Sequence, residues 1–277
     1  MNSKIRIKAK ALLSGNTARL FLVSFTSFLF RYGACTIFSY TIFYCYKSGF
    51  LSQLAEAYGK YLVYGCCAVL TLAVAFIFLL FISGIRLGES FVYFTRANGG
   101  RGNFRALFKF LSPRQSFRAL RIYLQITAQK LLWFVYFFIP VIICIGCIYN
   151  LYSNAFISQS VYIILSVGAS IILAFAFVMC RISHLRFSAS PYYLCLRENL
   201  SPSGAIKKSI LFTDGFLSEG VVLEYSLIGW ILSCLLIIPA FYAIPYYKLV
   251  KAVFVTEAIF SKSYAKTRYA VNILNLA

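Results

Sequence analysis

Long apolar segments alternate with shorter polar segments along the whole chain. An α-helix rises about 1.5 Å per residue, so about 20 apolar residues cross the roughly 30 Å of hydrocarbon in a bilayer. The pattern therefore predicts an all-α fold, a polytopic transmembrane helix bundle that forms a single membrane domain over residues 1–277. About six spans are predicted, near residues 20–45, 61–85, 131–149, 161–180, 221–238 and 246–260.

The last of these segments is the least apolar, because Lys248, Lys251 and Glu257 interrupt it. It either crosses the membrane or lies at the interface. Gly84 and Gly88 have the GxxxG spacing that permits close approach of two helices. Proline removes a backbone hydrogen bond, so three positions are expected to kink or end helices: Pro140, Pro239 and Pro245.

Basic amphipathic stretches separate the apolar segments. Residues 1–16 predict an interfacial helix, because Ile5, Ala9 and Leu12 share one helical face. A cleaved signal peptide is disfavoured, because Arg31 interrupts the apolar run that follows. Residues 86–130 and 181–219 predict further short basic helices in the inner headgroup layer. The side chains expected to contact anionic lipid are Arg105, Lys109, Arg114, Arg118, Arg121, Lys207 and Lys208.

Composition supports a membrane protein. Hydrophobic residues make up 61% of the chain and charged residues 12%, whereas a soluble domain is about a quarter charged. Lys and Arg number 27 against 7 Asp and Glu, a net charge of +20. On a soluble protein such a charge suggests nucleic acid, but no nucleic-acid-binding motif accompanies it. The expected partners are a bilayer with anionic headgroups on its cytoplasmic side and other membrane proteins, not nucleic acid.

The distribution of the cations predicts the topology. Of the 27 Lys and Arg residues, 22 lie in segments assigned to one side of the membrane: 1–19, 86–130, 181–219 and the tail from 262. Cytoplasmic loops of membrane proteins carry an excess of Lys and Arg. We therefore expect a multi-pass protein of the plasma membrane with both termini in the cytoplasm.

Five short segments carry a family resemblance: KAKALLSGN at 8–16, SASPYYLCLREN at 188–199, GAIKKSILFTDG at 204–215, YSLIGW at 225–230 and IPYY at 244–247. In this order they resemble the uncharacterised bacterial integral membrane proteins grouped as domain of unknown function 975. The resemblance implies a multi-helix protein of the plasma membrane. It implies no established activity and no agreed catalytic residues.

One charged residue stands out within the first predicted span. Arg31 lies near its middle, where an arginine costs at least about 2.5–3.5 kcal/mol and needs a partner. Glu224 and Glu257 are the expected partners, since both are predicted to lie at a shallow depth on the inner side. Such a polar cluster suits an anionic solute, a lipid headgroup or a proton relay. The alternative is an ion pair that fixes the packing of helices.

Little in the sequence favours catalysis. His184 is the one histidine, and no HExxH, GxSxG or paired-carboxylate motif is present. We expect no catalytic residues, no metal site, no cofactor and no enzymatic activity. The expected function is that of a non-enzymatic component that organises the membrane or binds lipid or a partner. The alternative is a transporter of a small solute or lipid, built around Arg31, Glu224 and Glu257.

Overall fold

The computed structural model describes residues 2–48, 53, 56, 58–100, 102–154, 156–196, 200–233 and 237–260. Every regular element among them is helical, as expected. The N-terminal half contains α1 (Asn2–Leu13), α2 (Thr17–Phe28), the π-helix η1 (Leu29–Gly33), α3 (Ala34–Lys47), α5 (Lys60–Ala97) and the 3-10 helix η2 (Phe104–Phe108). The remainder contains α6 (Pro113–Ser153), α7 (Gln159–Leu185), α8 (Ser190–Leu196), α9 (Pro202–Thr213), η3 (Asp214–Phe216), α10 (Leu217–Ser226), α11 (Ile228–Ser233), α12 (Ile237–Phe254) and the π-helix η4 (Val255–Phe260).

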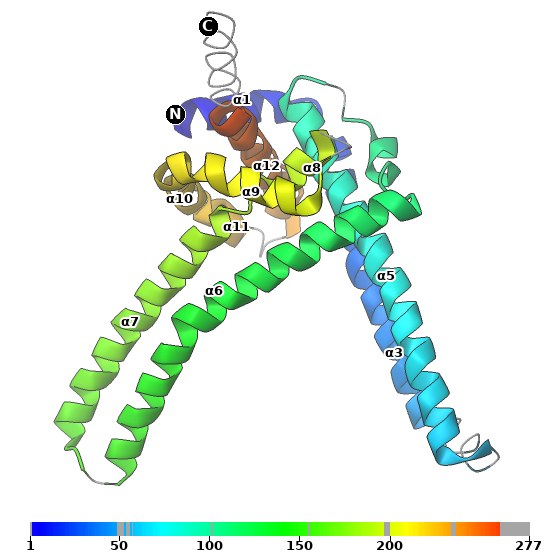
Figure 1. Cartoon of the computed structure of the whole chain (residues 1–277). Coiled ribbons are helices and arrows are strands. Elements are labelled where there is room, and N and C mark those ends of the chain that lie inside the picture. Colours follow the sequence, from blue (N-terminus) through cyan, green and yellow to red (C-terminus); the bar gives the residue numbers. More distant parts are fainter. Residues whose placement is uncertain are drawn as a thin grey trace, which may run out of the picture.

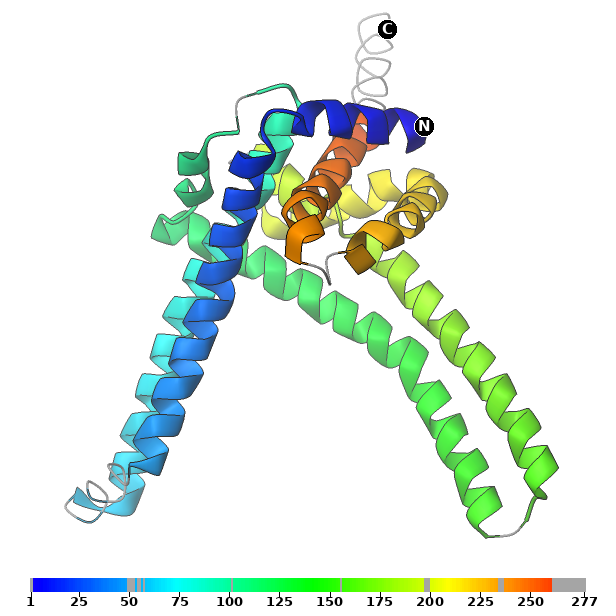
Figure 2. The same ribbon diagram turned by 180° about the vertical axis from the view of Figure 1, so that it is seen from behind.

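The protein consists of a packed cap and two long arms that diverge from it (Figures 1 and 2). We define the cap as α1, α2, residues 83–126, and α8 to η4. In the first arm, α3 runs beside residues 60–82 of α5, and the ring of Phe38 lies 5.7 Å from that of Phe78. In the second arm, residues 131–153 of α6 run beside residues 159–180 of α7. The first half of α6 crosses beneath the cap and joins the two arms (Figure 1).

Four helical segments among the described residues are long and apolar enough to cross a membrane: Thr17–Cys45, Lys60–Ala97, Pro113–Ser153 and Gln159–Leu196. They contain the first four predicted spans. The predicted fifth span is divided between α10, α11 and the start of α12, with residues 234–236 outside the described residues. The predicted sixth span lies in α12 and η4, which belong to the cap. Pro239 and Pro245 both lie within α12, and Pro140 lies within α6, so none of them ends its helix.

A hydrophobic core fills the cap. Among the described residues, none of the buried residues of this core comes from 24–84 or 127–186. Helix α12 is central to it, with Leu249, Val250 and Val253 completely buried. Helix α1 places Ile5 and Ala9 against this core. The predicted apolar face of α1 therefore exists, but α12 covers it rather than lipid, and the basic residues of α1 point outward.

Close packing where α5 enters the cap depends on the two glycines of the GxxxG spacing, Gly84 and Gly88. A Cβ built on Gly88 would overlap the backbone carbonyl of Leu107, and one on Gly84 would lie 2.8 Å from the carbonyl oxygen of Phe110. The segment that leads into α6 therefore rests directly on the backbone of α5. Residues 86–130 were predicted to form short basic helices. The 3-10 helix η2 is short, but the basic stretch from Pro113 is not a separate helix, because it forms the first half of the continuous α6.

Candidate functional site

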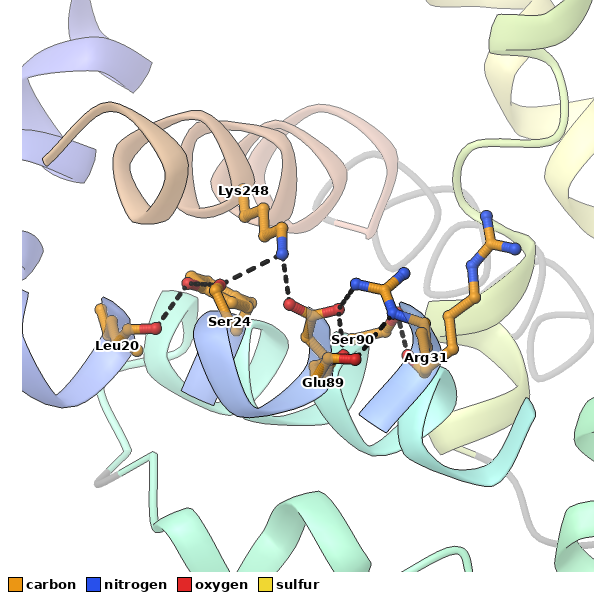
Figure 3. Close-up of polar contacts among 9 residues, drawn as sticks. Leu20, Ser24, Arg31, Glu89, Ser90 and Lys248 are labelled. Carbon is orange, nitrogen blue, oxygen red and sulfur yellow. Dashed lines mark hydrogen bonds and ion pairs between the residues drawn. The ribbon is translucent and has the colours of Figure 1, made fainter. Parts of the chain in front are cut away.

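A buried carboxylate lies where α2, η1, α5 and α12 meet. Glu89 of α5 is 6% exposed. Its Oε2 accepts a hydrogen bond from Ser27 Oγ at 3.0 Å and lies 3.3 Å from Arg31 Nη2. Its Oε1 contacts the Nζ of Lys248 from α12. Figure 3 shows the carboxylate held between the arginine and the lysine. Two cations from different helices thus share one acid.

A chain of hydrogen bonds extends this cluster toward α1. Lys248 Nζ donates to Ser24 Oγ at 3.1 Å, and Ser24 Oγ lies 2.7 Å from the hydroxyl of Tyr93. Tyr93 in turn donates to the backbone carbonyl of Leu20 at 3.0 Å (Figure 3). Each polar group in this chain has a partner, which is what makes a buried polar network stabilising rather than costly. The network connects α2, α5 and α12.

The charges in the cluster are only partly shielded from one another by solvent. The side chain of Glu89 is 8% exposed, against 23% for Arg31 and 28% for Lys248. Burial lowers the pKa of Lys248 below its ordinary value, and the Glu89 carboxylate opposes this shift. Removal of the carboxylate would leave two cations desolvated without a counter-charge.

Arg31 therefore has a different partner from the two predicted ones. Arg31 lies at the middle of the candidate span Thr17–Cys45, and its partner Glu89 follows the apolar run of α5 by a few residues. The sequence contains a signal for this arrangement. Ser24 and Ser27 of α2 and Arg31 of η1 recur at helical spacing, and residues 86–130 contain one acid, Glu89. Lys248 had no such signal, because only the fold brings α12 to this site.

Glu224, the first of the two expected partners, belongs to a second cluster. It is 2.8 Å from Arg181 Nη2 of α7 and 2.7 Å from Lys251 Nζ of α12. Lys251 also lies over the ring of Tyr247, 4.6 Å from its centroid. The predicted third member, Glu257, contacts Lys8 at the surface of the cap, where both side chains are 44% exposed. The structure thus does not bring Arg31, Glu224 and Glu257 together.

The cations expected to contact lipid fall into two groups. Arg118 donates to the backbone carbonyl of Leu200 at 2.7 Å, and Lys208 is half-buried. Lys109 is exposed but lies 4.6 Å from the centroid of the Phe91 ring. The other members are exposed: Arg105, Arg114, Arg121 and Lys207. The face of α6 that carries Arg118 and Gln125 is therefore directed at the α8–α9 connection and at α9, where Gln125 bonds Ser203 at 3.0 Å.

Candidate metal ligands are scattered in the described part of the chain. In that part of the chain, no three His, Cys, Asp or Glu residues form a group that could hold a metal ion. His184 Nε2 is 3.4 Å from Cys180 Sγ and 3.4 Å from the carbonyl oxygen of Lys130. The histidine therefore joins the end of α7 to α6.

Fold and site together define a helical protein with four candidate membrane-spanning segments and a cap whose acids Glu89 and Glu224 each pair with cations. The chain belongs to the family described as Protein of unknown function (DUF975), whose model matches residues 1–261. This match confirms the resemblance carried by the short segments. No curated protein and no solved structure was found to match the chain.

Proposed function

We propose that this chain is a non-enzymatic, multi-pass protein of the plasma membrane whose cap lies on the cytoplasmic side, where the first half of α6 binds anionic lipid headgroups. One observation carries the proposal. Exposed cations and exposed large apolar side chains occupy the same face of that half-helix.

The opposite face of α6, which carries Ala119 and Ile122, is buried in the cap. On the exposed face Phe117 is 53% and Leu124 is 55% exposed, and Arg114 and Arg121 lie beside them. Water would solvate the two arginines but not the two apolar side chains. The boundary between headgroups and acyl chains solvates both kinds of side chain, and basic residues there are attracted to anionic lipid.

The charge distribution between the two ends of the arms supports the orientation. The first arm ends at Lys47 and Lys60, and residues 150–160 at the end of the second arm contain no charged residue. The cap holds most of the remaining cations of the described residues. An excess of Lys and Arg is typical of the cytoplasmic side. Four spans, in place of six, return the chain to the side on which it began, so both termini are proposed to be cytoplasmic.

The test measures how lipid changes thermal stability. Purified protein in a neutral detergent is heated with phosphatidylglycerol or with phosphatidylcholine. We expect phosphatidylglycerol to raise the unfolding midpoint more, because a ligand that binds only the folded state stabilises it. The double variant Arg114→Gln/Arg121→Gln should lose about 1 kcal/mol of this lipid-dependent stabilisation per arginine.

The matched control is Lys47→Gln/Lys60→Gln, which removes two exposed cations from the opposite end of the first arm. It should respond to phosphatidylglycerol as the parent does. Equal effects of the two lipids on the parent, or a full response in the α6 variant, would contradict the proposal.

A transporter of a small solute or lipid is the second candidate function. The cluster of Arg31, Glu89 and Lys248 favours it, because two cations share one acid where two candidate spans meet the cap. An Arg31→Ala variant separates the two functions. If it folds with parental stability yet abolishes uptake or efflux of a solute, the protein is a transporter. If it chiefly lowers stability, the cluster holds the helices together.

A further inference from the structure

A small pocket opens between the end of α7 and the helices α10 and α11. Its volume is about 220 Å³. Helix α7 lines it with one face that includes Phe177, Val178 and Arg181, and α10 contributes Val221 and Glu224. Tyr225, Ile228 and Tyr247 complete the wall. The pocket is thus apolar except where Arg181 and Glu224 meet.

Positive charge exceeds negative charge at the polar end. Arg181 and Lys251 both pair with Glu224, and Lys130 of α6 interacts electrostatically with all three. The side chain of Arg181 remains 47% exposed and that of Lys251 34%, whereas Glu224 is 16% exposed. Of these cations Arg181 lines the pocket, and its exposed surface is available to a second anion. Arginine binds phosphate through two parallel hydrogen bonds.

We propose that this pocket binds one anionic phospholipid, with its phosphate at Arg181 and its acyl chain against Phe177, Val178 and Val221. The inference rests on the proposed function, which puts the polar end of the pocket at the headgroup layer. It adds a specific site to the lipid contact proposed for α6.

The apolar walls favour a lipid over a soluble anion. Phe177 is 58% and Tyr225 48% exposed at the rim, and α7 continues into the second arm with Ile171 66% exposed. Pockets that bind drug-sized ligands have volumes of about 300–1,000 Å³, so a pocket of about 220 Å³ accommodates only part of a lipid. The rest of the acyl chain would lie along the apolar surface of the arm.

Substitution of Glu224 distinguishes a lipid-binding site from a cluster that only joins helices. The carboxylate competes with the phosphate for Arg181. Its neutralisation in Glu224→Gln should therefore strengthen lipid binding, whereas Arg181→Gln should weaken it. A site that only joined α7 to α10 and α12 would be damaged by both changes.

Trp230 of α11 is a reporter close to the pocket, since its ring lies 5.3 Å from that of Tyr246, beside Tyr247. In a Trp133→Phe background it is the one tryptophan. Phosphatidylglycerol brominated on its acyl chains is titrated into the protein in phosphatidylcholine micelles, and quenching of Trp230 is measured. We expect saturable quenching, with half-saturation shifted about tenfold upward in Arg181→Gln, as for loss of one charged hydrogen bond.

Glu224→Gln should saturate at a lower lipid concentration, and Arg19→Gln, an exposed cation on α2 outside the pocket, should match the parent. The unfolding midpoint in phosphatidylcholine confirms that each variant is folded. Equal quenching by brominated phosphatidylcholine, an unchanged Arg181→Gln or a weakened Glu224→Gln would overturn the pocket site. Displacement of the lipid by millimolar inorganic phosphate would show a soluble-anion site instead and would also overturn it.

The two proposals fail separately. If phosphatidylglycerol stabilises the protein through Arg114 and Arg121, but its brominated form does not quench Trp230 selectively, the pocket site is wrong and the proposed function is supported. If Trp230 is quenched selectively, but phosphatidylglycerol stabilises the α6 variant as much as the parent, the contact proposed for α6 is wrong and the pocket site is supported.

Discussion

Helix α12 of the cap and helix α7 of the second arm are about equally apolar, yet they have different surroundings. In the cap, Leu249 and Val250 are completely buried by other helices. In the arms, Leu70 is 64% and Ile171 66% exposed. A continuous surface of exposed side chains of this size needs an apolar solvent. The comparison teaches that a run of apolar residues shows that a segment avoids water, but not whether lipid or protein covers it.

The polar groups of the two regions differ in the same way. The cap carries Glu89 and Glu224, each paired with two cations. The acid at the end of the first arm, Glu56, is exposed. Substitutions in the cap should therefore disturb packing and ion pairs, whereas substitutions in the arms should disturb insertion into the membrane.

The largest effect is expected from Glu89→Gln. Loss of the carboxylate charge leaves Arg31 and Lys248 desolvated, and breaking a buried ion pair from one side costs about 3–5 kcal/mol. Denaturant-induced unfolding in detergent should show this loss. Glu56→Gln, the control in the first arm, should change stability by less than about 0.5 kcal/mol. A loss at Glu89 no larger than at Glu56 would show that the cluster does not hold the cap together.

The next effect tests which solvent each region meets. Ile171 in the second arm and Ile7 on α1 are almost equally exposed, at 66% and 68%. Ile171→Arg should cost about 2.5–3.5 kcal/mol of insertion free energy, the value for a charge at the centre of a span. Ile7→Arg should cost nothing, because that side chain faces water. The measurement is the fraction of each variant that stays in the membrane after alkaline extraction. Similar fractions for the two variants would contradict the distinction between arm and cap.

The smallest effect compares two glycines. Gly88→Ala forces a Cβ into the backbone of Leu107 and should destabilise the protein by about 1–3 kcal/mol. No atom lies within 4 Å of a Cβ built on Gly168 in the second arm. Gly168→Ala should be neutral or stabilising by up to about 1 kcal/mol, since alanine favours the helix. Thermal unfolding of both variants in the same detergent gives the comparison, and equal losses would argue against the close approach at Gly88.

The candidate site was only partly predictable. A charged residue such as Arg31 in an apolar run requires a partner, and that requirement follows from solvation alone. The identity of the partner does not, because Glu89, Glu224 and Glu257 all lie far from it along the chain. The structure pairs Arg31 with Glu89, because η1 and α5 are neighbours, whereas Glu224 and Glu257 pair with other cations. The helical spacing of Ser24 and Ser27 with Arg31 was the one local hint.

The amino-acid sequence by itself determined that the protein is helical, that its apolar segments avoid water and that its cations gather in a few segments. These properties depend on composition and on the period of the helix, which are local. Only the tertiary structure decided that α12 packs into the core of the cap, that it covers α1, and which acid meets which cation. Those outcomes depend on contacts between segments far apart in the chain, and helical periodicity gives the face of a helix that is covered but not what covers it.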